Sequence, residues 1–179
     1  MKFYLLMLTL ITSTASWATI QTSSCPDLTT VKNIVTDMQA SNSSSTTKTI
    51  DKNNWSVQVL AINDSPYYFV ESAPETRLNN VVVNDLQFVD ASLHFLWLIE
   101  YRSGSIQCSY KSNNKDIVKF GLSKNVHFGV VNELPFTFYP ETGPWLTAHS
   151  DKGMDNTYDR DYTYICSGVA AEACKFQYE

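Results

Sequence analysis

Four cysteines, spread along most of the chain, constrain its fold more than any other feature of the sequence. They are Cys25, Cys108, Cys166 and Cys174. Disulfides persist in oxidising compartments and are rare in the cytosol, so the meaning of these cysteines depends on where the protein resides. The N-terminal residues indicate the compartment in which the protein resides.

The first eighteen residues, MKFYLLMLTLITSTASWA, have the features of a secretory signal peptide. Lys2 gives a positive start, an apolar stretch runs from Phe3 to about Ile11, and small residues follow at Ser16 and Ala18. The apolar stretch is short for a bilayer, which argues against a membrane anchor. We expect residues 1–18 to be removed, leaving residues 19–179 as a single exported domain that is secreted or periplasmic.

In an exported chain an even number of cysteines predicts a disulfide framework, and four cysteines allow three connectivities. We favour Cys25–Cys108 with Cys166–Cys174, because the first bridge would tie a lone helix to the central hairpin. The main alternative joins Cys108 to Cys174, since both precede an aromatic residue by two positions in a β-rich stretch. The spacings lack the Cys-x-x-Cys pairs that zinc sites and thioredoxin-like centres use.

One segment has a helical pattern. Apolar residues recur there at spacings of three and four: Leu28, Val31, Ile34, Val35 and Met38. Pro26 suits the first turn of a helix and Asp27 suits its positive end. The following residues, 41–54, are polar with almost nothing to bury, which predicts a polar loop.

From Trp55 onward the pattern is typical of β-strands. Residues 55–62 alternate, and residues 93–111 predict a hairpin around the sequence RSGS. Further short candidates are residues 66–72, 116–122, 125–131, 135–139, 162–166 and 174–178. The chain therefore predicts a disulfide-stapled α+β fold, with one N-terminal helix on a largely antiparallel sheet; curling of that sheet towards a barrel is one outcome that the pattern allows.

The charge of the chain limits its partners. The formal net charge is −5, so a phosphate backbone would not be held by counterion release, and we expect no nucleic-acid partner. The longest later apolar run, residues 93–99, is interrupted by His94 and followed by Glu100, so we expect no transmembrane segment after signal cleavage.

An aromatic segment is the first candidate binding surface. Phe136, Phe138, Tyr139 and Trp145 lie between prolines, and aromatic faces on a rigid loop can bind sugars or peptides. The alternative is a strand, a turn and a tryptophan of the core. An unknown protein or glycan is the partner that this candidate implies.

An acidic segment is the second candidate. Asp151, Asp155 and Asp159, followed by Asp161, surround Gly153, and calcium prefers several oxygen ligands on a tight loop. The order of residues in a calcium-binding loop is absent, and no glutamate closes it. We therefore expect a solvated loop, with calcium as the weaker alternative and no cofactor elsewhere.

No catalytic motif is present: the chain lacks Gly-x-Ser-x-Gly, His-Glu-x-x-His and a glycine-rich phosphate loop. The histidines are His94, His127 and His149, and with nearby carboxylates they could form a non-standard hydrolase site. We expect a non-enzymatic binding protein, with a secreted hydrolase as the alternative.

Several short motifs resemble a group of small, exported bacterial proteins of unknown function. A Cys-Pro pair opens a helix, a Phe-x-x-Ala segment precedes a strand, and a Cys-x-Tyr strand follows; the matching positions are Cys25, Pro26, Phe88, Ala91, Cys108 and Tyr110. The resemblance covers the first half of the chain after the leader. It implies an envelope or secreted location in a Gram-negative bacterium and no established activity.

Overall fold

The computed structural model describes residues 20–43, 45–61, 81–97, 101–113, 116–127, 139–141, 143–152 and 160–178. The strands are β1 (Gln21–Ser24), β2 (Ser45–Ile50), β3 (Asn53–Ala61), β4 (Gln87–Trp97), β5 (Tyr101–Lys111), β6 (Asp116–His127), β7 (Tyr139–Pro140), β8 (Trp145–Lys152), β9 (Arg160–Ser167) and β10 (Lys175–Tyr178). The helices are α1 (Leu28–Ser41) and the 3₁₀ turns η2 (Val83–Asp85) and η3 (Ala171–Ala173). The predicted leader lies outside the described residues.

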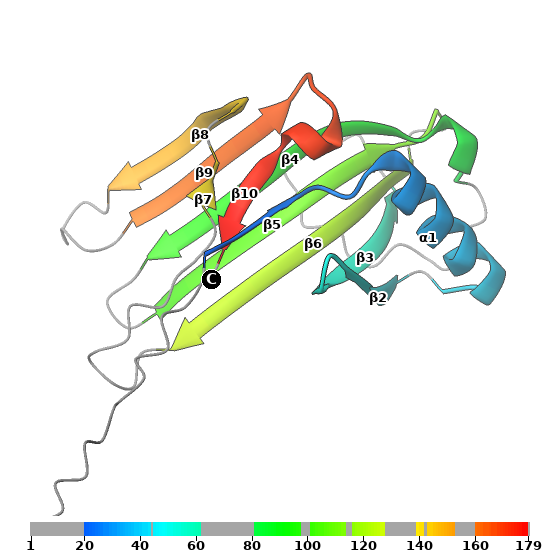
Figure 1. The fold of residues 1–179 in the computed structure, drawn as a ribbon, viewed down its shortest axis with the longest axis horizontal. Coiled ribbons are helices and arrows are strands. Elements are labelled where there is room, and N and C mark those ends of the chain that lie inside the picture. The colour runs from blue at the N-terminus through cyan, green and yellow to red at the C-terminus, as the bar shows by residue number, and fades with distance from the viewer. Residues whose placement is uncertain are drawn as a thin grey trace, which may run out of the picture.

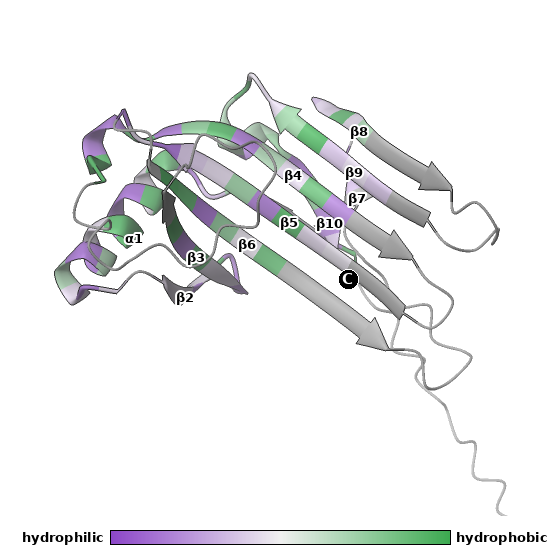
Figure 2. Cartoon of the chain, turned by 180° about the vertical axis from the view of Figure 1, so that it is seen from behind, coloured by the Kyte–Doolittle hydropathy of each residue, from purple (hydrophilic) through white to green (hydrophobic). Residues whose placement is uncertain are grey.

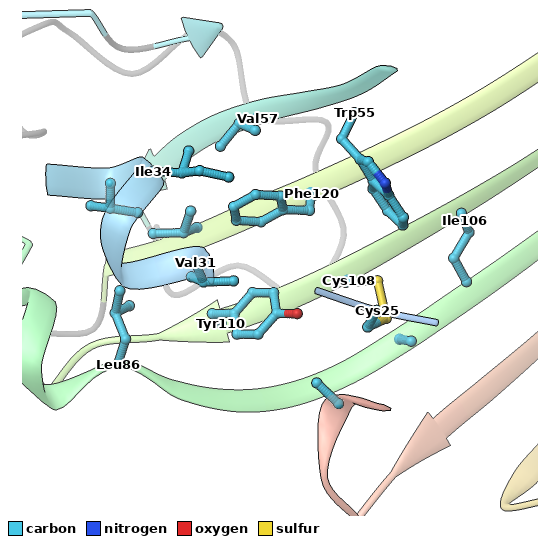
Figure 3. Packing of buried hydrophobic residues seen from close by; sticks show 14 of the residues in the cluster. Cys25, Val31, Ile34, Trp55, Val57, Leu86, Ile106, Cys108, Tyr110 and Phe120 are labelled. Atoms are coloured by element: carbon cyan, nitrogen blue, oxygen red, sulfur yellow. A yellow bond between two sulfur atoms is a disulfide. The ribbon is translucent and has the colours of Figure 1, made fainter. Parts of the chain in front are cut away.

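The described strands form two antiparallel sheets (Figure 1). The large sheet has the order β2-β3-β6-β5-β4-β9-β8, and the small sheet has the order β1-β10-β7. Helix α1 and the small sheet lie on the same face of the large sheet, and the core fills the space between these layers (Figure 3). The predicted α+β class, with one helix on an antiparallel sheet, is confirmed.

The sheet does not curl into a barrel, which corrects that part of the prediction. Among the described strands, β2 and β8 stand at opposite ends of the large sheet and do not pair with each other. The physical reason is the second layer, because α1 and β10 cover the apolar face of the sheet. The sheet can therefore bury that face without closing on itself.

Helix α1 forms where the apolar spacing predicts it. Val31, Ile34, Val35 and Met38 are buried, whereas Leu28 is 37% exposed and contributes less to the stripe than expected. The helix begins at Leu28, so Pro26 precedes it instead of lying in its first turn; Asp27 is the N-cap and accepts a hydrogen bond from the Thr30 N–H at 2.9 Å. At the other end Asn42 adopts a left-handed conformation that closes a Schellman motif.

The prediction of a polar loop over residues 41–54 is wrong for most of its length. Ser45–Ile50 is an edge strand that pairs with β3, and a two-residue turn joins the two strands. Both turn residues, Asp51 and Lys52, have positive φ, as a type I′ hairpin requires. Edge strands can remain polar on both faces, so the absence of buried apolar residues did not exclude a strand here.

Two further strand predictions need correction. The sequence RSGS was predicted to form the turn of the hairpin, but it lies inside β5. Trp97 of β4 pairs with Arg102 of β5, so the chain reverses direction between these two residues. Gly104 is buried within the strand, in register with Phe95. Residues 116–122 and 125–127 belong to the single strand β6, and β1 and β8 were not predicted. The candidate strand at residues 66–72 lies outside the described residues.

Candidate functional site

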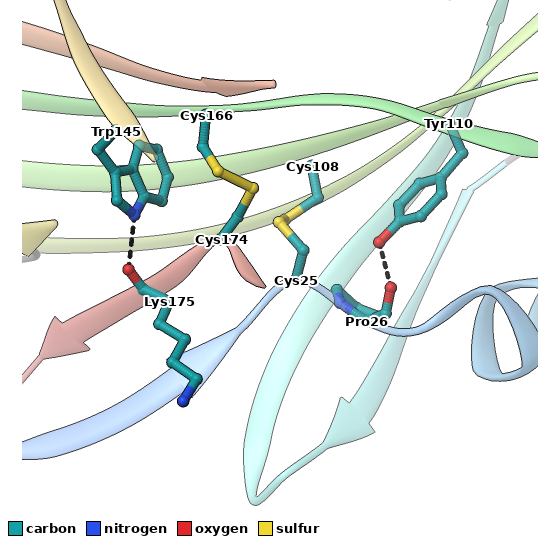
Figure 4. The surroundings of a disulfide bond; sticks show 8 residues. All are labelled: Cys25, Pro26, Cys108, Tyr110, Trp145, Cys166, Cys174 and Lys175. Atoms are coloured by element: carbon teal, nitrogen blue, oxygen red, sulfur yellow. Dashed lines mark hydrogen bonds between the residues drawn. A yellow bond between two sulfur atoms is a disulfide. The ribbon is translucent and has the colours of Figure 1, made fainter. Parts of the chain in front are cut away.

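Two disulfides hold the covered face of the large sheet to the chain segments above it (Figure 4). Cys25, between β1 and α1, pairs with Cys108 of β5, and Cys166 of β9 pairs with Cys174 before β10. The favoured connectivity is confirmed and the Cys108–Cys174 alternative is wrong. Each cysteine is at most 1% exposed, so the four are structural and leave no thiol for redox or metal chemistry.

The residues that carry the family resemblance gather around the first disulfide. The Tyr110 hydroxyl donates a hydrogen bond to the Pro26 carbonyl, and the Tyr110 ring lies edge-on to Phe88 at 5.5 Å. Ala91 is in register with Cys108. Burial, with the negative charges of Glu172 and Asp27, raises the pKa of Tyr110, so its phenol remains a neutral donor. These residues form a packing cluster of the core.

Of the four residues of the aromatic candidate surface, the structure describes the side chain of Trp145 alone. The indole N–H of Trp145 donates to the Lys175 carbonyl at 2.7 Å, and the ring is half-buried against the core (Figure 4). Tyr139 lies on β7 in register with Gln177. Phe136 and Phe138 lie outside the described residues. Trp145 is thus a structural residue, as the alternative interpretation expected.

The acidic candidate is only in part a loop. Asp151 lies on β8 and pairs in register with Asp161 on β9, because residues 145–152 and 160–167 form a hairpin. Asp155 and Asp159 lie outside the described residues. Among the side chains that the structure does describe, no group of three or more histidine, cysteine or acidic residues could hold a metal ion.

The other face of the large sheet carries the most distinctive surface among the described residues. Side chains alternate along each strand, so Leu93 and Ile106 enter the core while their neighbours reach the opposite face. No described element packs on that face, which we call the open face (Figure 2). Its central positions are half-buried and mainly polar: Ser92, His94, Ser105, Gln107, Lys119 and Thr163.

Exposed aliphatic side chains also lie on the otherwise polar open face. Leu146 of β8 is 71% exposed, Ile165 of β9 is 36% exposed, and the two are in register. Ser92 flanks Ile165 on β4, and nearby the Lys119 ammonium donates a hydrogen bond to the side-chain amide oxygen Oε1 of Gln107 at 3.1 Å. The exposure of Ile165 could have been predicted from the sequence. In a strand whose Tyr164 and Cys166 side chains point towards the core, the side chain between them points to the opposite face.

The histidines are distributed unevenly over the sheet. His94 of β4 and His149 of β8 are both in register with Thr163 of β9, one on each side of it. His127 lies at the end of β6 in register with Tyr101. Two of the three predicted candidate histidines therefore occupy one row of the sheet.

Within the described part of the chain, two buried polar atoms have no hydrogen-bond partner, the Ser23 hydroxyl and the indole nitrogen of Trp55. Both residues adjoin Phe176, since Ser23 is in register with it and the Trp55 ring lies 6.2 Å from the Phe176 ring. This pair lies in the interface between the two sheets.

Comparison of the chain with protein-family models, with curated proteins and with solved structures finds no match. Among the described residues, no helix has the length and apolar character needed to cross a membrane. The function must therefore be inferred from the surface described above.

Proposed function

We propose that the protein is exported, to the periplasm or the medium, and acts without catalysis by binding a partner protein through its open face. The two buried disulfides support export, because such bonds form and persist in oxidising compartments. The signal-like N-terminus of the sequence supports it as well.

The observation that carries the binding proposal is the exposed aliphatic pair Leu146–Ile165 within polar surroundings. Protein interfaces commonly have an apolar centre and a polar rim that supplies hydrogen bonds. Here Ser92, Gln107 and Thr163 provide such a rim on the neighbouring positions. A glycan is the weaker candidate, because sugar sites rely on exposed aromatic faces and the Trp145 ring packs against the core.

Site-specific photocrosslinking in the exporting cell tests this proposal. A photoreactive residue at Leu146 or Ile165 should give one discrete adduct, whereas the same residue at Asn33, exposed on α1, should give none. Excess unlabelled protein should compete for the adduct, and the Ile165→Glu variant should compete poorly. Equal adducts from Asn33, or none from the open face, would exclude this surface.

The export proposal has a separate test. N-terminal sequencing of the protein recovered from the periplasm or medium should begin at Thr19. Recovery of the full leader on a cytosolic protein would contradict the proposal. Thiol labelling of the same sample should find the four cysteines blocked.

A further inference from the structure

One row of residues crosses the open face from one edge of the large sheet to the other, at right angles to the strands (Figure 2). From β8 to β2, each member is in register with the next: Leu146, Ile165, Ser92, Gln107, Gly121, Ser56 and Thr47. Their neighbours along the strands, such as Leu93, Ile106 and Trp55, are buried, which places the row on the open face. We call these seven residues the cross-strand row.

The two ends of the cross-strand row differ in shape. At the β8 end, Leu146 is 71% exposed and Ile165 is 36% exposed, so aliphatic side chains stand above the sheet. Towards β3, Gly121 has no side chain, and the Ser56 hydroxyl lies close to the backbone because it donates a hydrogen bond to the Gly121 carbonyl at 2.9 Å. A Cβ atom at Gly121 would lie 2.9 Å from the Ser56 Oγ. One end of the row is therefore raised and apolar, and this stretch near the other end is low.

The middle of the row supplies complementary hydrogen-bonding groups. The Oε1 atom of Gln107 accepts from the Lys119 ammonium at 3.1 Å, so the side-chain N–H groups of Gln107 can still donate. Ser92, in register with Gln107, carries a hydroxyl that can accept such a bond. Two such residues side by side can bond to a second copy of themselves in reversed order.

We propose that the partner on the open face is a second copy of this chain, in a two-fold symmetric dimer with the two large sheets face to face. The two-fold axis runs parallel to the strands, between β4 and β5, so the two cross-strand rows meet in reversed order. Ile165 then faces Gly121 of the second copy, Leu146 faces Ser56, and Ser92 faces Gln107. Such an interface is isologous, so each contact occurs twice. This proposal rests on the proposed function, because it names the partner of the same surface.

The reversed order fills space that the alternative order leaves empty. If each residue of the row faced its own copy, Gly121 would face Gly121 with no side chain on either side. Packed interfaces contain few such voids, because atoms that line a void lose their contacts. In the reversed order the aliphatic pair of each copy covers the low stretch of the other.

The size of the open face predicts a reversible dimer. Seven strands spaced about 4.8 Å apart span about 29 Å, and the row with its two neighbouring rows covers about 20 Å along the strands. The two copies together would bury roughly 1,100 Å², which is near the minimum for a specific interface. The dimer should therefore form at high concentration and dissociate on dilution.

Sedimentation velocity on the purified, oxidised, exported protein tests the proposal over a dilution series. We expect the mass to rise with concentration from one chain to two and no further, because a two-fold contact closes the assembly. Ile165→Glu and Leu146→Glu should each raise the concentration at the midpoint by at least roughly tenfold, because each places an unpaired carboxylate in the interface.

Leu28→Glu is the matched control. Leu28 is 37% exposed, close to the value for Ile165, but it lies on α1 on the other side of the large sheet (Figure 1). This change should leave the midpoint where it is. Equal weakening by Leu28→Glu and Ile165→Glu, or a native protein that stays monomeric at every concentration, would overturn the proposal.

Photocrosslinking of the purified protein tests the order of the rows. Isotopically light and heavy chains are mixed, each with a photoreactive residue at position 165, and adducts between a light and a heavy chain are mapped by mass spectrometry. They should join position 165 to the segments around Ser56 and Gly121. Adducts to α1, or to residues 163–167 of the second copy, would refute the reversed order and the proposal with it.

The same photoreactive protein separates failure of this proposal from failure of the proposed function. A discrete adduct in the exporting cell at a mass other than two chains, with a purified protein that stays monomeric, would refute the second copy as partner. The binding role of the open face would then stand. Absence of adducts both in the cell and in the purified protein would refute both.

Discussion

Removing each disulfide in turn tests how the two bridges stabilise the fold. Cys25 and Cys108 are 83 residues apart, whereas Cys166 and Cys174 are 8 residues apart. The chain-entropy model assigns about 4.5 kcal/mol to the long loop and about 2.5 kcal/mol to the short one. The double variant Cys25→Ala/Cys108→Ala should therefore lose about 2 kcal/mol more than Cys166→Ala/Cys174→Ala.

The two variants control for each other. All four cysteines are at most 1% exposed, so each variant deletes the same buried atoms and the packing losses largely cancel. Urea unfolding followed by tryptophan fluorescence gives the free energy of unfolding of both variants and of the oxidised native protein. For a domain of this size the expected difference corresponds to roughly 4–8 °C in melting temperature.

The contrary result is well defined. Equal losses, or a larger loss for the short bridge, would show that loop entropy does not control the stability of this protein. Should the long-bridge variant unfold in plain buffer, the three proteins can be compared in the same concentration of a stabilising osmolyte, which favours burial in all of them.

Three smaller predictions use the same unfolding assay. Tyr110→Phe should cost about 1–3 kcal/mol, because the buried Pro26 carbonyl loses its donor; no loss would mean that another donor reaches it. Hydrogen bonds from Thr30 lower the pKa of Asp27 below 3.8, so its stabilisation is present above that pH and is lost as the pH falls through the folded-state value. Asp27→Asn, which keeps a cap that does not titrate, should lose less stability on acidification below about pH 4 than the native protein does; equal pH profiles would contradict this. Ser23→Ala removes a buried hydroxyl without a partner and should leave stability unchanged or raise it by up to about 1 kcal/mol, whereas a clear loss would reveal a hydrogen bond there.

Features with a strong local signal could be predicted from the sequence. The three- and four-residue spacing of Val31, Ile34 and Met38 requires a helix with one buried face, and that face is buried. The disulfide pairing was also accessible, because a lone helix at the start of the chain needs a link to the sheet. The helix follows from neighbouring residues, whereas the pairing of Cys25 with Cys108, 83 residues apart, follows from the even number of cysteines and the isolation of the helix.

Features that depend on tertiary context were missed. Strand β2 has few apolar residues, and its turn uses Asp51 and Lys52 where hairpins usually carry asparagine and glycine, so neither pattern marked it. Strand β8 was hidden among acidic residues, and only its pairing with β9 shows that Asp151 and Asp161 are neighbours. The row that joins His94 to His149 involves three strands and cannot be derived from spacing alone.

The pairing of β1 with β10 determines how the molecule can be attached to something else. Gln21 and Tyr178 are neighbours in the small sheet, so both ends of the described chain emerge at one place, on the side opposite the open face (Figure 1). A tag, a fused domain or a solid support joined to either end would therefore leave Leu146 and Ile165 directed outward. The fold thus determines how the immobilised protein is oriented, and attachment through either end of the described chain suits binding measurements on the open face.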